Sequence, residues 1–201
     1  MEGTKERILL AALRLFARKG YEAVSVSDIA AELGITKGAL YRHYESKRHI
    51  FDSILRRMEQ RDASEARAHA LPEGTKAAAG EAYERVTAGQ AAAFGKAMFR
   101  YWTADEFAAC FRRMLTLEQY RDPEMGRLYR QYLSTGPLDY MTDILAALGL
   151  PEPRAAAVRF YAPMFLLYSV YDASEEGAAV TALADRLLDA AAEEWKGERG
   201  T

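Results

Sequence analysis

Residues 25–47 read SVSDIAAELGITKGALYRHYESK, and this stretch predicts two short helices joined by a tight turn. Ser25 stands three residues before Asp28, the spacing of a capping box, in which two side chains satisfy free backbone N–H groups at a helix start. Gly34 supplies the backbone freedom that a turn needs where the first helix ends. Thr36 is a good N-cap for the second helix. This order of cap, turn and second cap predicts a helix-turn-helix.

The second of these helices carries side chains that suit a DNA-reading surface. Its apolar residues fall on one side and anchor it, which leaves small and basic residues on the other faces. Lys37 can donate to guanine, and the methyl group of Ala39 can touch a thymine methyl. Tyr41, His43 and Lys47 are spaced to contact phosphate oxygens. The complete set of expected DNA contacts is Ser25, Ser27, Thr36, Lys37, Gly38, Ala39, Tyr41, Arg42, His43 and Lys47, with Arg42 suited to either kind of contact.

Each piece of this stretch, taken alone, also fits a pair of amphipathic helices in an unrelated bundle. The pieces occur together and in order, which favours DNA reading. The charge distribution agrees, because residues 1–61 hold 12 Lys and Arg against 8 Asp and Glu (net +4), whereas the remainder holds 15 against 21 (net −6). Binding to phosphates needs local positive charge, so the overall net charge of −2 does not argue against DNA.

Further features extend over residues 5–55. They are a leading helix that ends in FARKGY at residues 16–21, the pair Ile29-Ala30, Gly34, the pair Leu40-Tyr41, Tyr44 and the pair Ser46-Lys47. On these features the stretch resembles the DNA-binding domain of TetR-type (TetR/AcrR) bacterial transcriptional regulators. The resemblance implies a homodimeric repressor whose helical body binds an inducer, and whose release from a palindromic operator follows ligand binding.

Length and composition predict an all-α protein with two domains. The chain has 201 residues, of which half are apolar and 28% charged, so it is long enough for a small head and a larger body with its own core. Helical periodicity without any strand pattern predicts helices at 47–69, 76–101, 104–119, 123–147, 154–172 and 177–195. We expect an N-terminal three-helix helix-turn-helix DNA-binding domain at residues 1–47 and a C-terminal helical ligand-binding and dimerisation domain at residues 48–201.

The predicted body carries many aromatic and methionine side chains at helical spacings. Ordinary core packing accounts for any one of them, but as a set they also suit a site for a small, largely apolar ligand. Pro163 lies inside a predicted helix and should bend it, either beside this site or at an interface. The expected ligand-binding residues are Phe94, Met98, Tyr101, Trp102, Phe107, Phe111, Met114, Tyr132, Tyr161, Met164, Phe165 and Tyr168.

The last two predicted helices are candidates for a homodimer interface. The final helix has an apolar stripe with alanines that permit close approach of a second helix. The resemblance implies a four-helix interface built from these two helices of each subunit, and the alternative is that the stripe packs only within its own chain. The expected interface residues are Val180, Leu183, Ala184, Leu187, Leu188 and Ala191.

Motifs of the common catalytic sites are missing from the sequence. It contains no G-x-S-x-G, no G-x-x-x-x-G-K-[ST], no G-x-G-x-x-G and no H-E-x-x-H. We expect His49 and His69 on the surface, since neither has cysteines or carboxylates at metal-ligand spacing. Cys110 is the single cysteine and is expected to be a small buried hydrophobe, although neighbouring arginines leave redox sensing open. We therefore expect neither an enzyme nor a cofactor.

The sequence also favours a cytoplasmic protein without a membrane segment. It shows no secretion leader, and the apolar run at residues 160–171 is shorter than the roughly 20 residues that a membrane helix requires. Two hypotheses of function remain. The first is a ligand-responsive dimeric repressor bound to operator DNA, and the second is a DNA-binding regulator whose body recruits a protein partner. A helical enzyme with a vestigial head is a distant third.

Overall fold

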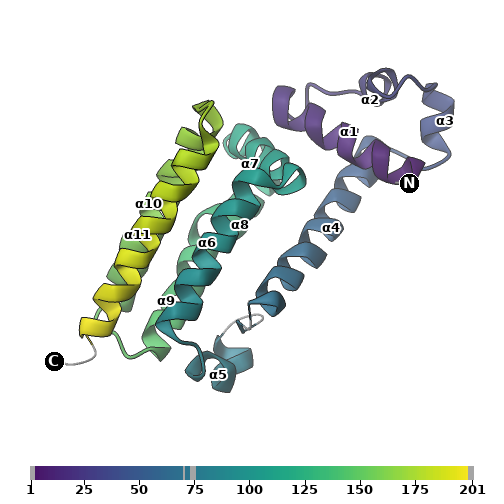
Figure 1. Cartoon of the computed structure of the whole chain (residues 1–201). Helices are drawn as coiled ribbons and strands as arrows, with labels where there is room; N and C mark the ends of the chain where they lie inside the picture. The colour runs from purple at the N-terminus through teal and green to yellow at the C-terminus, as the bar shows by residue number, and fades with distance from the viewer. Residues whose placement is uncertain (1–2, 70, 73–75, 199–201) are drawn as a thin grey trace. The chain divides into compact units, whose positions relative to one another are not determined.

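The computed structural model describes residues 3–69, 71–72 and 76–198, and these residues form helices and connecting turns without a strand. The prediction of an all-α fold is confirmed (Figure 1). The helices in the described ranges are α1 (Thr4–Lys19), α2 (Val26–Glu32), α3 (Lys37–Tyr41), α4 (Lys47–Ala68), α5 (Lys76–Glu84), α6 (Ala88–Ala104), α7 (Glu106–Glu118), α8 (Pro123–Leu133), α9 (Thr135–Ala147), α10 (Pro153–Ala173) and α11 (Gly177–Glu198).

The chain divides into two compact units that do not follow the order of the sequence. The head unit consists of Met1–Arg61 and Glu106–Tyr129, and the body unit consists of Asp62–Asp105 and Arg130–Thr201. Helices α4 and α8 therefore contribute residues to both units. The head unit is larger than the DNA-binding domain predicted at residues 1–47, because it also includes residues 48–61 and 106–129. That the DNA-binding domain ends at residue 47 stays a prediction.

In the head unit, α1 packs against α2 and α7. Helix α1 buries Leu13 and Phe16 completely, and α7 does the same with Phe111 and Leu115. These residues recur at helical spacing, so each helix presents one apolar face to the shared core. Helix α1 ends at Gly20, whose φ of 85° is a conformation that glycine adopts without steric cost.

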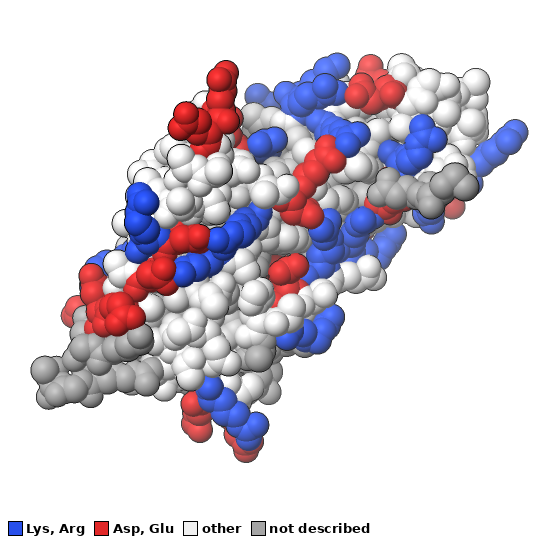
Figure 2. Space-filling model, viewed as in Figure 1, with Lys and Arg blue, Asp and Glu red and all other residues white. Residues whose placement is uncertain are grey.

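In the body unit, α11 packs against α6 and α10, and α10 also packs against α6 and α9. Gly95 allows the close approach in the core, because a methyl group at this position would lie 2.5 Å from Phe160 Cζ and 3.4 Å from Leu188 Cδ2. On the outside, Arg100 on α6 pairs with Asp185 on α11 at 2.5 Å, beside a second pair between Lys96 and Asp189. Positive and negative groups accordingly alternate over α6 and α11 (Figure 2).

Two of the predicted helices are each broken into two, so the prediction of continuous helices over 76–101 and 123–147 is wrong. The first break precedes a capping box, in which Gln90 N–H donates to Thr87 Oγ1 at 3.2 Å and Thr87 N–H donates to Gln90 Oε1 at 2.9 Å. These two bonds satisfy amides that only a helix start leaves free, so α6 begins here. The second break lies at Ser134, and Pro137 follows in the first turn of α9, where a missing N–H costs little.

Replacement of Thr87 with alanine should destabilise the body unit. Thr87 is exposed, so the substitution removes the cap of α6 without opening a cavity, and we expect the free energy of unfolding to fall by about 1 kcal/mol. Thr181→Ala is the matched control, because the hydroxyl of Thr181 only donates back to Gly177 O within α11. Urea unfolding measures both variants. Equal losses in the two would contradict the role of Thr87 as a cap.

Candidate nucleic-acid interface

The first helix of the predicted helix-turn-helix starts with the expected capping box. Asp28 N–H donates to Ser25 Oγ at 3.1 Å, and Ser25 N–H donates to Asp28 Oδ2 at 2.7 Å. Hydrogen bonds from the side chain and backbone of Ser25 hold the pKa of the Asp28 carboxyl below its usual value. Gly34 then adopts a φ of 64°, which confirms the glycine turn between α2 and α3.

Helix α3 is a single short element held by its neighbours. It begins at Thr36, whose hydroxyl accepts a hydrogen bond from Ala39 N–H at 3.1 Å. Leu40 is fully buried, and Tyr44, just beyond the helix, is 1% exposed. The hydroxyl of Tyr44 donates to Lys5 O at 3.3 Å, which ties this end of the element to α1. The other faces of α3 remain open to solvent.

Most of the predicted DNA contacts lie on this open surface. Lys37 is exposed, with Nζ 5.8 Å from the centroid of the Tyr41 ring, and Tyr41 itself is 43% exposed. The structure leaves exposed Ser25, Ser27, Thr36, Lys37, Gly38, Tyr41, Arg42 and His43, and half-buries Ala39 and Lys47. Basic and hydrogen-bonding groups are thus gathered on one short helix and the residues that flank it.

Lys47 differs from the other predicted contacts because its ammonium group is turned toward the turn between α1 and α2. Its Nζ donates to Tyr21 O at 3.0 Å and to Glu22 O at 3.5 Å, and it lies 4.2 Å from the centroid of the Tyr21 ring. A phosphate contact from Lys47 would compete with these two carbonyl groups. The sequence could not reveal this, since 26 residues separate Lys47 from Tyr21.

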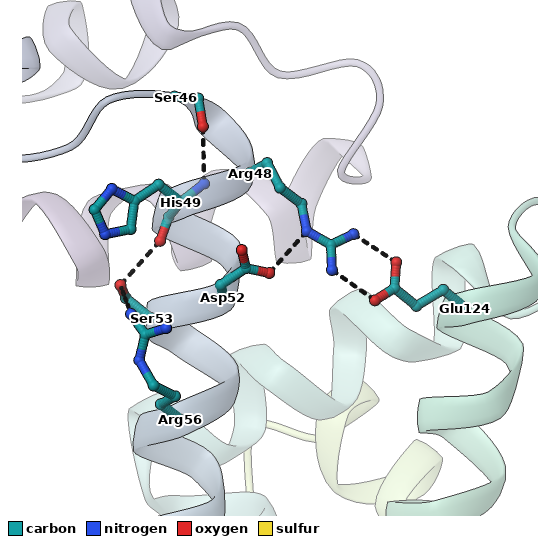
Figure 3. A network of polar contacts seen from close by, with 7 residues as sticks. All are labelled: Ser46, Arg48, His49, Asp52, Ser53, Arg56 and Glu124. Carbon is teal, nitrogen blue, oxygen red and sulfur yellow. Dashed lines mark hydrogen bonds and ion pairs between the residues drawn. The ribbon is translucent and has the colours of Figure 1, made fainter.

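A polar network connects the start of α4 with α8 within the head unit (Figure 3). Ser46 Oγ accepts a hydrogen bond from His49 N–H at 3.0 Å. The guanidinium group of Arg48 donates to Asp52 at 2.7 Å and to both carboxylate oxygens of Glu124 at 2.5 and 2.7 Å. The hydrogen bonds from Arg48 hold the pKa of the Glu124 carboxyl below its usual value.

Residues 8–54 match the family model described as bacterial regulatory proteins of the tetR family. Over this segment the chain is similar to that family. The HTH-type transcriptional repressor BepR of Brucella suis is 44% identical over 54 residues, which are 27% of this chain and 26% of BepR. Alignments with the first curated relatives cover between 16% and 28% of those proteins' own length. These relatives are named as transcriptional regulators and repressors.

Solved structures of TetR-like regulators share the fold over nearly the whole chain. The fatty acid degradation regulator FadR from Bacillus halodurans superimposes with a TM-score of 0.64 at 19% identity, over 96% of this chain and 96% of FadR. The SmeT–triclosan complex superimposes with a TM-score of 0.62 at 19% identity, over 94% of this chain and 90% of SmeT, a repressor from Stenotrophomonas maltophilia. The predicted fold, a helix-turn-helix domain followed by a helical body, is therefore confirmed.

The expected ligand-binding residues are distributed over both units. Phe107, Phe111 and Met114 lie on α7 in the head unit, where all three are buried. The Phe107 ring faces the guanidinium groups of Arg57 and Arg61, at 4.9 and 5.4 Å from its centroid. These three residues belong to the packing of the head unit and share no unit with the other nine.

The nine expected ligand-binding residues of the body unit differ in exposure. Met98, Tyr101, Trp102, Tyr132, Met164 and Tyr168 are buried, Phe94 and Tyr161 are half-buried, and Phe165 is exposed. Within the buried group, the Trp102 ring lies 5.3 Å from that of Tyr101 and 6.5 Å from that of Tyr132. Tyr140, outside the expected set, adds a ring 6.0 Å from Phe94 and donates its hydroxyl to Pro72 O at 2.9 Å.

The expected interface residues on α11 fall on two different faces. Val180, Ala184 and Leu188 are buried within the body unit, whereas Leu183 is 37% and Leu187 40% exposed. Packing within the chain thus accounts for the first three, and Ala191 is half-buried. Helix α10 adds further exposed apolar side chains, namely Val158, Phe165, Leu166 and Val170.

The histidines and the cysteine show no sign of a catalytic or metal site. His49 and His69, which were expected on the surface, are partly exposed and contact the rings of Tyr44 and Phe94. Cys110 is buried as predicted, and burial raises the pKa of its thiol. Across the described ranges, no group of three or more His, Cys, Asp and Glu is placed to hold a metal ion. No helix in those ranges is both long and apolar enough to cross a membrane.

The ion pair between Arg48 and Glu124 should make stability depend on pH. The folded-state pKa of Glu124 lies below its usual value of 4.5, so the contribution of the pair is present above that value and is lost as the pH falls through the folded pKa. Glu124→Gln should lower the free energy of unfolding by up to about 1 kcal/mol near pH 7, and this loss should shrink as the pH falls below 4.5. Urea unfolding across this pH range measures the difference. Glu59→Gln, at an exposed position on α4, serves as the control, and a loss in Glu124→Gln that persists in acid would contradict the assignment.

Proposed function

We propose that this protein is a sequence-specific DNA-binding transcriptional regulator that acts as a repressor in the cytoplasm. The observation that carries the proposal is the exposed face of α3, where Lys37 and Tyr41 are open to solvent, with exposed His43 just beyond the helix and Leu40 buried on its opposite side. The match of residues 8–54 to the tetR family model supports the same function, and BepR, which is similar over 54 residues, is named a repressor. In the proposed complex α3 lies in the major groove, with residues 37–39 at the base edges and with Tyr41, Arg42 and His43 at the phosphates.

The proposal predicts different effects for two neighbouring side chains. Selection of bound duplexes from a random-sequence pool first identifies the operator sequence. Lys37→Ala should then weaken binding to the selected duplex by about 1–3 kcal/mol and relax the base preference, because Lys37 reads a base edge. Tyr41→Phe removes only a hydroxyl and should weaken binding to all sequences alike, because phosphates carry no sequence information. Wild-type affinity in both variants would show that α3 does not read DNA, and failure of the wild type to select any sequence would overturn the function itself.

We further propose that the functional unit is a two-fold homodimer formed through α10 and α11. The support is the run of exposed apolar side chains on both helices, which includes Leu166 at 65% and Leu187 at 40% exposure. A second copy would remove these side chains from water and would place two α3 helices on one operator. The selected sequence should then be a near-palindrome, with half-sites separated by a multiple of about 10 base pairs.

Charged residues on the exposed face of α11 should separate the proposed dimer. The double variant Leu183→Glu/Leu187→Glu should sediment as a folded monomer, because both side chains are exposed within the chain and are not part of its core. Leu117→Glu is the matched control, since Leu117 is 42% exposed but lies on α7. A stable dimer in the double variant would remove α11 from the interface.

We also propose that a small, largely apolar molecule binds in the body unit and releases the protein from DNA. The support is the buried aromatic group around Trp102, with Tyr101 and Tyr132 beside it. SmeT, which shares the fold, is known in complex with triclosan. We place the ligand among the body-unit residues of the expected set and leave out Phe107, Phe111 and Met114, which belong to the head unit.

Ligand binding and DNA binding must weaken each other equally if they are coupled. A coupling of about 1–3 kcal/mol would lower operator affinity some 5- to 150-fold in the presence of the ligand. Trp102 fluorescence, recorded in a Trp195→Phe background, allows a panel of small aromatic compounds to be titrated with and without the selected duplex. A compound that binds tightly with the same affinity in both titrations would contradict ligand release. In that case a body that recruits a protein partner becomes the better hypothesis.

A further inference from the structure

The turn between α1 and α2 is held through both backbone polar groups of one residue, Tyr21. Tyr21 N–H donates to Glu118 Oε1 at 3.0 Å, and Tyr21 O accepts a hydrogen bond from Lys47 Nζ at 3.0 Å. The Tyr21 ring lies 5.1 Å from the rings of both Phe16 and Phe51. These contacts come from α1, α4 and α7, all within the head unit, so three helices fix the position of this residue.

Glu118 occupies an unusual environment for a carboxylate at the end of α7. Its side chain is 1% exposed, and Oε2 is buried without a hydrogen-bond partner among the described residues. A buried carboxylate is costly unless it forms strong hydrogen bonds, and the bond from Tyr21 N–H is of that charge-assisted kind. Arg121 comes only within 3.6 Å of Oε1 and is itself largely exposed.

Gly20 leaves the space that this carboxylate fills. A methyl group on Gly20 would overlap Glu118 Oε1, and the φ of 85° also disfavours any residue with a Cβ. The backbone of the turn and the side chain of α7 are therefore fitted to each other.

The turn at Tyr21 is directly connected to the helix-turn-helix. Val24 N–H donates to Tyr21 O at 3.3 Å, and Val24 is buried. The next residue, Ser25, is the cap of α2, and α2 packs on α3. A displacement of the Tyr21 amide would thus shift the start of α2 and, through it, the angle of α3.

We propose that Glu118 is a positioning residue for DNA reading, which fixes the Tyr21 amide and thereby orients α2 and α3. The inference rests on the proposed DNA-binding function and adds a residue from α7 to it. Base contacts depend on the angle of α3, whereas phosphate contacts tolerate small changes and carry no sequence information. Loss of the contact should therefore reduce binding to the operator more than binding to other DNA.

Three substitutions at Glu118 separate the hydrogen bond from the charge and from simple packing. Glu118→Gln keeps an oxygen acceptor at the same reach and should bind the selected duplex within about twofold of wild type. Glu118→Asp keeps the charge but withdraws the carboxylate by one methylene, beyond hydrogen-bond distance of Tyr21 N–H. Glu118→Asp and Glu118→Ala should both bind the selected duplex about tenfold more weakly, with binding to a scrambled duplex changed by less than about twofold.

Fluorescence anisotropy on the selected and the scrambled duplex gives the ratio of affinities, and circular dichroism establishes that each full-length variant is folded under the same conditions. Glu106→Ala is the matched control, because it removes an exposed ion pair with Arg14 between the same two helices and should leave the ratio unchanged. The inference is overturned if Glu118→Asp keeps the wild-type ratio, if Glu118→Gln loses it, or if Glu106→Ala loses as much. A wild type that selects no sequence would instead overturn the proposed function, and the inference with it.

Discussion

A recognition helix of five residues cannot keep its shape in water, so α3 depends on the burial of Leu40 and Tyr44. Isolated helices shorter than about 12 residues are only marginally stable, because too few hydrogen bonds offset the cost of the first turn. Thr36 satisfies one free amide at the start, and the hydroxyl of Tyr44 reaches Lys5 O on α1. With its apolar side held in this way, α3 can expose polar side chains on every other side without unfolding.

The head that holds α3 is completed by a segment from far along the chain. Helix α7 supplies the apolar face against which α1 packs, and Glu118 reaches the backbone of Tyr21. The exposed pairs Arg14–Glu106 and Arg48–Glu124 each contribute little, since water screens them, and most of the stability of this contact comes from buried apolar surface. Helices α4 and α8 each contribute residues to both units.

Exposure separates core from interface on the last two helices, where residue type alone does not. Leu187 and Leu188 are chemically identical neighbours, yet one is 40% and the other 1% exposed. Leu188 faces Gly95 and Phe160, and a helix turns by about 100° from one residue to the next, so Leu187 is directed away from them. Phe165, one of the expected ligand-binding residues, is 46% exposed, as are other apolar side chains of α10 such as Leu166 at 65%.

The sequence by itself determined the features that depend on interactions over three or four residues. The capping box of Ser25 and Asp28, the turn at Gly34 and the cap at Thr36 could be predicted because their partners are neighbours in the chain. The same kind of pattern at Thr87 and Gln90 lies inside a long helical periodicity, which by itself predicts one continuous helix.

Only the tertiary structure decided which distant groups meet. The ammonium group of Lys47 finds carbonyl groups 26 and 25 residues away, and Glu118 finds an amide 97 residues away. Phenylalanine is a residue type common in ligand sites, but the ring of Phe107 packs against the guanidinium groups of two arginines of α4. Such contacts depend on how whole helices pack. The residue type alone therefore does not predict which distant group a charged or aromatic side chain will contact.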